Sequence, residues 1–338
     1  MQSQIVNKVL VTGAAGYVGS LLVRELLASG YAVVGVDHLG HGCNGLADLN
    51  GHARFNLLQT DVRVLTQRQL QGVCAVVDLA AISSVEAAAL DAQGTDDMNH
   101  LARVRLAELA RTAGVQRHVL VSSAAVYGDT GSDVADESRP VAPQSDYALA
   151  CVKAEQGVLA LAGAQFCPVV LRPGTAYGLS PRMREDLMVN RMTRTAVQQR
   201  RIVLRGHGQQ WRPHVHVRDL VRAIVCALRV DAEMARAEIF NIAHSNLRAC
   251  TVAEMVREVV GADVTISCDG RNPDPSSYRV DVWKARHILG WRHYESLCSG
   301  TFEVANELRH DLSAAAAIPA GAGLLARVAG QSQGRRLN

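Results

Sequence analysis

A glycine-rich loop between an apolar run and an apolar helix most strongly constrains what this chain can fold into. Residues 12–19 read Thr-Gly-Ala-Ala-Gly-Tyr-Val-Gly, follow the run Val9-Leu10-Val11 and precede leucines at helical spacing. Glycines at such a turn let the backbone approach a phosphate, and the first turn of the helix offers unpaired N–H groups. The pattern predicts a strand, a tight turn and a helix that bind a pyrophosphate. The residues expected around it are Gly13, Ala15, Gly16, Tyr17, Val18 and Gly19.

A carboxylate after the second apolar run indicates which dinucleotide binds there. The run from Tyr31 to Val36 ends at Asp37, which is followed by His38. An acidic residue at this place accepts hydrogen bonds from the ribose hydroxyls and repels a 2′-phosphate. We therefore predict NAD rather than NADP, with Asp37 and His38 beside the ribose. The alternative is a glycine-rich turn followed by a solvated carboxylate.

Composition is that of an ordinary globular chain with a sizeable core. The 338 residues are 48% hydrophobic and carry a formal net charge of +3, with lysine and arginine scattered along the sequence. We expect no nucleic-acid partner, because no basic stripe is present. No run is long enough to cross a membrane, and the eight cysteines form no C-x-x-C pair, so we expect a cytoplasmic protein without a membrane or metal site.

Alternating apolar runs and helical patterns predict the fold class. Six strand-like runs are separated by helical segments, which is typical of a parallel sheet covered on both faces. The runs are Val9–Thr12, Ala32–Asp37, Arg54–Leu57, Ala75–Leu79, His118–Ser122 and Pro168–Arg172. We predict an α/β protein with a doubly wound parallel (Rossmann) sheet and a smaller C-terminal substrate-binding domain.

The loosened pattern after Arg172 indicates an interleaved second region. We expect an NAD-binding domain over 1–175 with returning segments near 214–244, a substrate domain over 176–313 and a flexible tail over 314–338. Within the second region, Gly206–Pro213 reads as a loop, Asp219–Leu228 as a helix and Ile239–Ile242 as one more core strand.

Serine and tyrosine residues that could move a proton follow the fifth strand. Ser122 and Ser123 stand at its carboxyl end, and Tyr147 begins a helix after Pro143. A tyrosine hydroxyl beside a nicotinamide can act as general acid or base, and a nearby serine can hydrogen-bond the reacting oxygen.

These motifs together resemble the extended short-chain dehydrogenase/reductase family, in its NAD-dependent nucleotide-sugar epimerase/dehydratase branch. The resemblance runs from about Lys8 to about Asp311 and rests on T-G-x-x-G-x-x-G at Thr12–Gly19, S-S-x-x-V-Y-G at Ser122–Gly128 and the tyrosine at 147. It implies that Ser123 and Tyr147 are catalytic. It also implies cofactor contacts from Asp61, Val62, Leu79, Ala80, Ala81, Asn99, Ser122, Tyr147 and Pro173.

One departure from the family pattern bears on activity. The pattern Y-x-x-x-K requires lysine at position 151, where this chain has Cys151, and the nearest lysine is Lys153. Side chains two positions apart on a helix point in directions about 200° apart, so Lys153 is expected to point away from the cleft. Without that charge, Tyr147 should ionise only near its ordinary pKa of about 10, which predicts slow turnover or a shift to high pH. Cys151 as a nucleophile or redox sensor, or as a tolerated replacement, is the alternative.

The resemblance also indicates which residues bind the substrate. It implies that Arg212 and Arg271 bind the diphosphate of a nucleoside-diphosphate sugar through charge-assisted bonds. Further residues expected at the substrate are Ser83, Ser123, Thr175, Tyr177 and Asn190. A homodimer through helices near 100–112 and 147–162 is also implied.

The leading functional prediction is 4-epimerisation of a nucleoside-diphosphate sugar through a transient 4-keto intermediate. Dehydration is disfavoured, because Ala124 and Ala125 replace the acidic pair that the family's 4,6-dehydratases carry after the catalytic serine or threonine. Reduction of a 4-keto sugar, or binding of NAD and a nucleotide sugar without turnover, are the alternatives.

Overall fold

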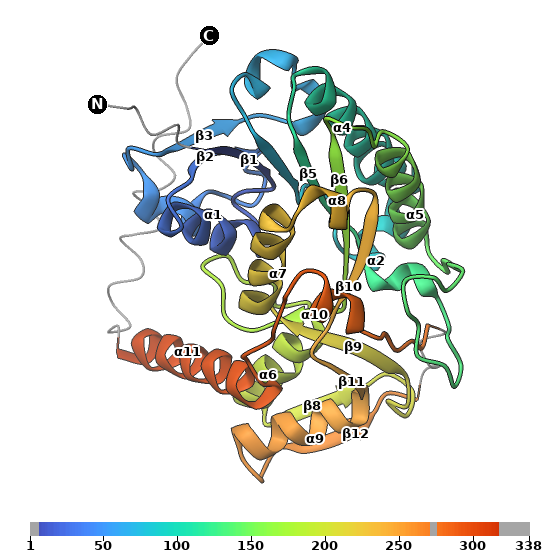
Figure 1. Ribbon diagram of the computed structural model, residues 1–338. Helices are drawn as coiled ribbons and strands as arrows, with labels where there is room; N and C mark the ends of the chain where they lie inside the picture. Colours follow the sequence, from blue (N-terminus) through green and yellow to red (C-terminus); the bar gives the residue numbers. More distant parts are fainter. Residues whose placement is uncertain (1–6, 271–275, 318–338) are drawn as a thin grey trace.

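A seven-stranded sheet forms the centre of the computed structural model, which describes residues 7–270 and 276–317 (Figure 1). The strand order is β10-β6-β5-β4-β1-β2-β3, and every pair in it is parallel, as the alternation of strands and helices predicted. The strands are β1 Lys8–Thr12, β2 Ala32–Asp37, β3 Phe55–Gln59, β4 Ala75–Asp78, β5 Arg117–Val121, β6 Cys167–Pro173 and β10 Glu238–Ile242. Chain order reverses between β1 and β4, which is where doubly wound sheets bind their ligands.

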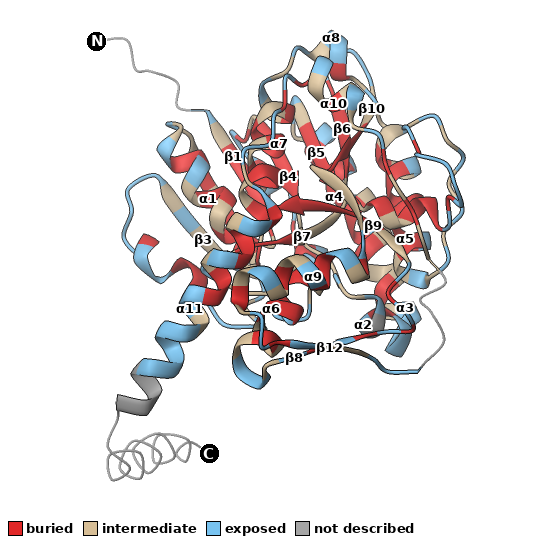
Figure 2. Cartoon of the chain, turned by 90° about the horizontal axis from the view of Figure 1, so that it is seen from below, coloured by how far each residue is buried: buried red, intermediate tan, exposed pale blue. Residues whose placement is uncertain are grey.

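Helices cover both faces of the sheet because the strands are apolar on both sides. Val9 and Val11 face one layer, and Leu10 between them faces the other. The first layer contains α1 Gly19–Ala28, α7 Val217–Arg229, α8 Ala232–Ala235 and α10 Trp283–His287, and the second contains α4 Ala102–Thr112 and α5 Asp146–Leu159. Figure 2 shows the buried strands between helices whose outer faces are exposed.

Short helices connect the strands near the crevice. They are η1 Asn44–Leu49, η2 Val62–Val64, η3 Gln67–Leu70, α2 Val85–Leu90, α3 Ala92–Asp96, η4 Asp97–Leu101 and η5 Ala124–Tyr127. One of them, η4, is a π-helix between α3 and α4. π-Helical turns are rare in proteins, and those that occur are often found at functional sites.

A smaller second unit lies below the sheet in Figure 1. A three-stranded sheet, in the order β11-β9-β7, and the pair β12-β8 pack beside three helices. The elements are β7 Thr175–Tyr177, β8 Arg201–Leu204, β9 Trp211–His216, β11 Ser245–Arg248, β12 Thr265–Cys268, α6 Met188–Gln199, α9 Ala249–Val260 and α11 Leu297–Ala317. The intervening α7 and β10 return to the central sheet.

Two local predictions differ from the structure. The expected loop Gly206–Pro213 becomes strand β9 from Trp211 onward, because its backbone pairs with β11, a contact that local sequence does not show. The expected tail is helical at its start, since α11 continues through Ala317 along an alanine run of high helix propensity. Residues 318–338 lie outside the described residues. Among the described residues, no helix has the length and apolar character needed to cross a membrane.

Candidate active site

The glycine loop between β1 and α1 leaves no room for side chains at its close approaches. Gly13 has φ of +63°, and a Cβ there would lie 3.1 Å from the backbone of Leu79 and Ala80. A Cβ at Gly19 would collide with the Gly13 carbonyl oxygen. The segment after β4 can pack against Gly13, and the start of α1 against the Gly13 carbonyl, because positions 13 and 19 carry no side chain.

Backbone amides at the start of α1 are available for a negatively charged ligand. Among the described residues, the amides of Tyr17 and Val18 donate no hydrogen bond, whereas the Gly16 amide donates to the Gly13 carbonyl oxygen at 3.0 Å. Unpaired N–H groups at a helix N-terminus, together with the helix dipole, suit a phosphate. The loop therefore fits the pyrophosphate of a dinucleotide.

The Asp37 carboxylate is held at the end of β2 by two backbone amides. Its Oδ2 accepts from the Ala15 amide at 3.0 Å and its Oδ1 from the Leu39 amide at 2.8 Å. These bonds orient a carboxylate next to the glycine loop, where it can accept ribose hydroxyls. The exposed ring of His38 has its Nδ1 3.8 Å from this carboxylate and accepts a bond from the Gly40 amide.

Asp61, expected at the adenine, is already engaged in an ion pair. Arg63 binds both of its carboxylate oxygens, and this hydrogen bonding lowers the pKa of the Asp61 carboxyl. The neighbouring Val62 is buried at the start of η2. If Asp61 contacts the adenine, it must do so while its carboxylate is also bound by Arg63.

The floor of the crevice is built by hydrogen bonds at the ends of β1 and β4. The Thr12 hydroxyl donates to Asp78 at 2.7 Å and accepts from the amides of Leu79 and Ala80. Asn99, on the π-helix η4, bonds both the N–H and the carbonyl of Ile82. Asn99 thus holds the segment from Leu79 to Ile82 in place and is itself completely buried. Ala81, within that segment, is half-buried.

Tyr147, Ser123 and Cys151 form one cluster at the carboxyl end of β5. Ser145 caps α5 by accepting from the Ala148 amide, which places Tyr147 in the first turn as predicted. Tyr147 packs against the apolar cluster that contains Cys151, and both Ser123 and Cys151 influence its ionisation. Burial raises the pKa of Tyr147, the adjacent Cys151 raises it further, and Arg103 and Ser123 lower it.

Cys151 is a buried thiol at neutral pH. Its side chain is 2% exposed, and burial raises its pKa to about 11. A reactive cysteine needs the thiolate and an electropositive, partly exposed setting. Cys151 is instead buried and protonated at neutral pH, which weighs against the alternative that it is a nucleophile or redox sensor.

Lys153 points out of the cluster, as its helical position predicted. Its Nζ pairs with Asp96 Oδ1 at 2.7 Å, and its side chain is 41% exposed. The nearest lysine in sequence therefore does not replace the side chain missing at position 151.

Ser122, expected at the cofactor, turns instead into a buried polar network. Its hydroxyl donates to Glu155, whose carboxylate also receives Nε and Nη2 of Arg172. The same guanidinium donates to the Tyr127 hydroxyl, which donates to Asn241. The network joins α5, β6, η5 and β10 beneath the cluster, so the Ser122 side chain is used in the core.

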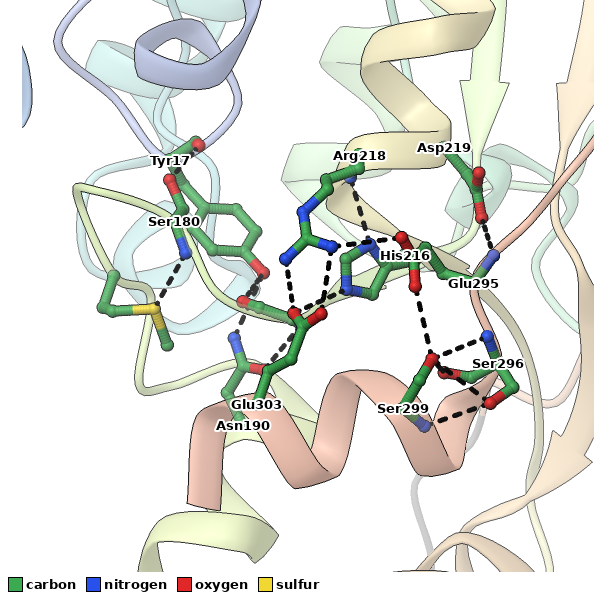
Figure 3. Close-up of polar contacts among 12 residues, drawn as sticks. Tyr17, Ser180, Asn190, His216, Arg218, Asp219, Glu295, Ser296, Ser299 and Glu303 are labelled. Carbon is green, nitrogen blue, oxygen red and sulfur yellow. Dashed lines mark hydrogen bonds and ion pairs between the residues drawn. The ribbon is translucent and has the colours of Figure 1, made fainter. Parts of the chain in front are cut away.

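Tyr17 and Asn190 join the glycine loop to the second unit (Figure 3). The Tyr17 hydroxyl donates to the Gly178 carbonyl at 2.7 Å, and Ser180 Oγ donates to the Tyr17 carbonyl at 2.7 Å. Asn190 is 1% exposed and bonds the Gly178 amide and the Tyr17 hydroxyl. The side chain expected to reach the sugar is therefore part of the connection between the two units.

The second unit is held to α7 by a cluster of charges, also drawn in Figure 3. Arg218 pairs with Glu295 at 3.1 Å and Glu303 at 2.6 Å, and Asp219 accepts from the Tyr294 and Glu295 amides. Tyr177, expected at the sugar, is completely buried with its ring edge against His216. Thr175, which was also expected at the sugar, is half-buried at the start of β7. Pro173, expected at the cofactor, is half-buried two residues earlier.

Of the two arginines expected at a diphosphate, only Arg212 lies within the described residues. It is 7% exposed, donates to the carbonyls of Trp211 and Ser276, and has its guanidinium 4.9 Å from the Tyr278 ring centre. Arg271 falls in 271–275, outside the described residues.

Two further arginines lie near the cluster and were missed by the sequence patterns. Arg184 donates to Ser83 Oγ and pairs with Asp186, and Tyr147 acts electrostatically on it. Arg103, on α4, donates to the Ala80 and Val121 carbonyls and influences the ionisation of both Tyr147 and Cys151. The arginine-rich stretch after Gly178 could have indicated the first. No local pattern indicates the second, because α4 is far from Tyr147 in sequence.

Comparisons with known proteins identify the family and several relatives of this chain. The family described as "NAD dependent epimerase/dehydratase family" matches residues 9–243. A UDP-glucose 4-epimerase of Mycolicibacterium smegmatis is 30% identical over 326 residues, which cover 90% of this chain and 99% of the relative. A dTDP-glucose 4,6-dehydratase of Streptomyces griseus is 31% identical, with 86% and 90% covered.

A solved structure extends the comparison to three dimensions. The UDP-glucuronic acid 4-epimerase of Bacillus cereus, in complex with UDP-glucuronic acid and NAD, superposes with a TM-score of 0.82 at 26% identity. The match covers 90% of this chain and 99% of that one.

Proposed function

We propose that this chain, which belongs to the NAD-dependent epimerase/dehydratase family, inverts the C4 carbon of a nucleoside-diphosphate sugar. The observation that carries the proposal is a glycine loop shaped for a dinucleotide in the same fold as Tyr147, at the start of α5, and Ser123, at the carboxyl end of β5, which influences the ionisation of Tyr147. The similar epimerases of known structure or activity act on UDP-glucose and UDP-glucuronic acid.

NAD is the proposed cofactor, and the residues present suit it. The free amides of Tyr17 and Val18 would hold the pyrophosphate, and Asp37 would accept the ribose hydroxyls while repelling a 2′-phosphate. The segment Leu79–Ile82, held by Thr12 and Asn99, would pass beneath the nicotinamide side. When bound, NAD would supply a reversible acceptor for the C4 hydride of the sugar.

The protein's own groups handle the proton. Tyr147 takes it from the C4 hydroxyl, and Ser123 donates a hydrogen bond to the oxygen as it becomes a carbonyl. After the sugar turns over, Tyr147 returns the proton to that oxygen. Ala124 and Ala125 offer no acid or base for removing a neighbouring hydroxyl, so dehydration is not proposed even though dehydratases are among the relatives.

We propose that this reaction is slow at neutral pH. A base must be ionised to accept a proton, and burial raises the pKa of Tyr147 above its ordinary value of about 10. Below that pKa the phenolate fraction rises about tenfold for each unit of pH. Turnover should therefore increase steadily from pH 7 to pH 10.

The experiment is incubation with UDP-glucose or UDP-glucuronic acid and a catalytic amount of oxidised NAD, followed by separation of the C4 epimers. Product without consumption of NADH supports the epimerase, and Tyr147→Phe and Ser123→Ala should each lower the rate at least a hundredfold. Stoichiometric use of NADH on a 4-keto sugar would instead identify a reductase. Binding of both ligands without exchange from pH 7 to 10 would identify a binding protein.

The proposed diphosphate partner is Arg212, together with Arg271 from the undescribed segment. The Arg212 guanidinium donates to the Trp211 carbonyl and lies over the Tyr278 ring, and a planar guanidinium matches the geometry of a diphosphate. We also propose a homodimer through α4 and α5 and a cytoplasmic location, the latter because all eight cysteines are free.

A further inference from the structure

One side chain of the second unit reaches across to the segment that follows β4. Arg184 lies in the loop between β7 and α6. Its Nη1 donates to the Ser83 hydroxyl at 2.5 Å and its Nη2 to the Ser83 carbonyl at 3.3 Å. Ser83 directly follows the segment that forms the floor of the crevice. At this place the two units are therefore bridged by two hydrogen bonds from a single guanidinium.

The guanidinium of Arg184 is held in the orientation that this bridge needs. Asp186 binds its other edge, where Nε donates to Oδ1 at 2.7 Å and Nη2 to Oδ2 at 2.5 Å. A bidentate carboxylate fixes the plane of a guanidinium and neutralises its charge. The Arg184 side chain is only 17% exposed. The arrangement suits a residue that holds a neutral serine rather than one that attracts an anion.

Buried asparagines fix the backbone at both ends of the bridge. Asn99, on η4, bonds the N–H and the carbonyl of Ile82, the residue before Ser83. Asn190, on α6, donates to the Arg184 carbonyl at 3.0 Å. Moving either end would leave polar groups of a buried amide without partners, which is unfavourable. The weakest part of the bridge is therefore the contact between the guanidinium and Ser83, which is exposed.

A second contact between the units lies at the glycine loop (Figure 3). The Tyr17 hydroxyl donates to the Gly178 carbonyl, and Ser180 donates to the Tyr17 carbonyl. Tyr17 and Ser180 are buried, in contrast to Ser83. One contact thus follows β1 and the other follows β4. Chain order reverses between these two neighbouring strands, so the contacts stand on either side of the crevice where doubly wound sheets bind their ligands.

We propose that Arg184 is a latch over the cofactor crevice, which holds Ser83 while NAD is bound and releases it before NAD enters or leaves. The buried contact at Tyr17 stays in place, and the exposed contact at Ser83 opens. The inference rests on the proposed function only in placing NAD between β1 and β4, and it requires no turnover of a sugar. It also gives Ser83, which was expected at the substrate, a different use.

A latch changes the kinetics of NAD binding in a way that a simple contact does not. If the crevice must open before NAD passes, a weaker latch accelerates entry and exit together, and the dissociation constant changes less than either rate constant. A residue that only touches NAD would change the release rate and the dissociation constant equally, and would leave the association rate as it was.

The experiment follows the fluorescence of NADH in stopped flow with the full, nucleotide-free chain and no sugar, and measures release by adding excess NAD. Arg184→Met removes both bonds to Ser83 and should raise the association and release rate constants about tenfold. The Asp186 carboxylate that it leaves behind is 53% exposed and stays solvated. Ser83→Ala removes only the hydroxyl bond and should raise both rate constants about threefold.

The double variant and a matched control show whether the bridge itself is responsible. Arg184→Met combined with Ser83→Ala should equal Arg184→Met alone, because the two changes break the same contact. Arg194→Met is the control. It removes an ion pair with Glu185 in the same loop, but this pair lies within the second unit, so neither rate constant should change.

Four outcomes are distinguishable. Faster release with unchanged association in Arg184→Met would overturn the latch and identify an ordinary contact with NAD. Unchanged rate constants, or additive effects in the double variant, would also overturn it. The expected rate changes without turnover of any sugar would support the latch and reject only the proposed activity. A chain that binds no NADH would reject both.

Discussion

At the scale of single residues, Cys151 should determine how readily Tyr147 ionises, because it replaces a cation. Its side chain lies against Tyr147 and contributes no charge, since burial raises its own pKa to about 11. A lysine there would place an ammonium beside the phenol, and one charge about 4 Å away lowers a pKa by up to roughly three units at an effective dielectric near 20.

We therefore expect Cys151→Lys to increase kcat at pH 7 by at least tenfold and to move the rise of the pH profile to lower pH. Cys151→Met is the control, because it fills the same space without charge and should leave the profile in place. The measurement is the epimerisation rate from pH 6 to 10. A lysine variant no faster than the parent at pH 7 would reject the proposed defect.

At the scale of elements, the loop between β1 and α1 packs so closely against the start of α1 that position 19 must be glycine. A methyl group at Gly19 would overlap the Gly13 carbonyl oxygen and the Ala14 backbone, so α1 or the loop would have to move. The same movement would disturb the amides of Tyr17 and Val18 that face the proposed pyrophosphate.

Gly19→Ala should therefore abolish NAD binding measured by calorimetry and lower the free energy of unfolding by about 2 to 4 kcal/mol. Gly163→Ala is the matched control, because a Cβ there meets no atom within 4 Å and its φ is not positive. It should change neither quantity beyond about 0.5 kcal/mol. Normal NAD affinity in Gly19→Ala would contradict the packing argument.

At the scale of the whole molecule, three buried histidines couple stability to pH. Burial lowers the pKa of His118 and His216 to about 4 and that of His214 to about 3. Their pKa in the unfolded chain is about 6.5, so the unfolded state binds protons first as the pH falls. Stability should be fully present above pH 6.5 and decrease between pH 6.5 and about 4, by up to about 1.4 kcal/mol per unit for each group.

Denaturant unfolding at several pH values between 7 and 4 measures this slope. His118→Leu should reduce it, because neither ring nitrogen of His118 has a hydrogen-bond partner among the described residues and an apolar side chain removes the titration. His52→Gln, at an exposed position, should leave the slope unchanged. Equal slopes in parent and His118→Leu would show that this histidine does not contribute.

The proposed dimer is also tested on the whole molecule. Exposed apolar side chains gather on and beside the helices expected at the interface. They are Val85, Leu90, Leu101 and Leu149, the last of them 43% exposed on α5. In Figure 1, α4 and α5 lie side by side at the outer face of the sheet.

Leu101→Glu and Leu149→Glu should each convert a dimer to a monomer in light scattering coupled to gel filtration, because a carboxylate buried in an apolar interface is unpaired. Met234→Glu, at an exposed apolar position on α8, serves as the control and should not change the mass. A parent chain that already elutes as a monomer would contradict the proposed assembly.

Local patterns in the sequence determined the sheet and its cofactor loop. Continuous apolar runs between helical patterns identified the strands that form the parallel core. The close packing at Gly13 and Gly19 and the position of Asp37 at the end of β2 could be predicted because turns and strand ends depend on neighbouring residues. The direction of Lys153 followed from helix geometry alone.

Only the tertiary structure decided how side chains from distant segments share one space. Tyr177 was expected at the sugar and lies in the core of the second unit, and Asn190 is buried where it bonds the Tyr17 hydroxyl. Strand β9 exists because β11 pairs with it. Arg103, on α4, donates to the carbonyls of Ala80 and Val121, which follow or end two different strands. Charges act through space and not along the chain, so the set of charged groups that influences Tyr147 is a property of the folded molecule.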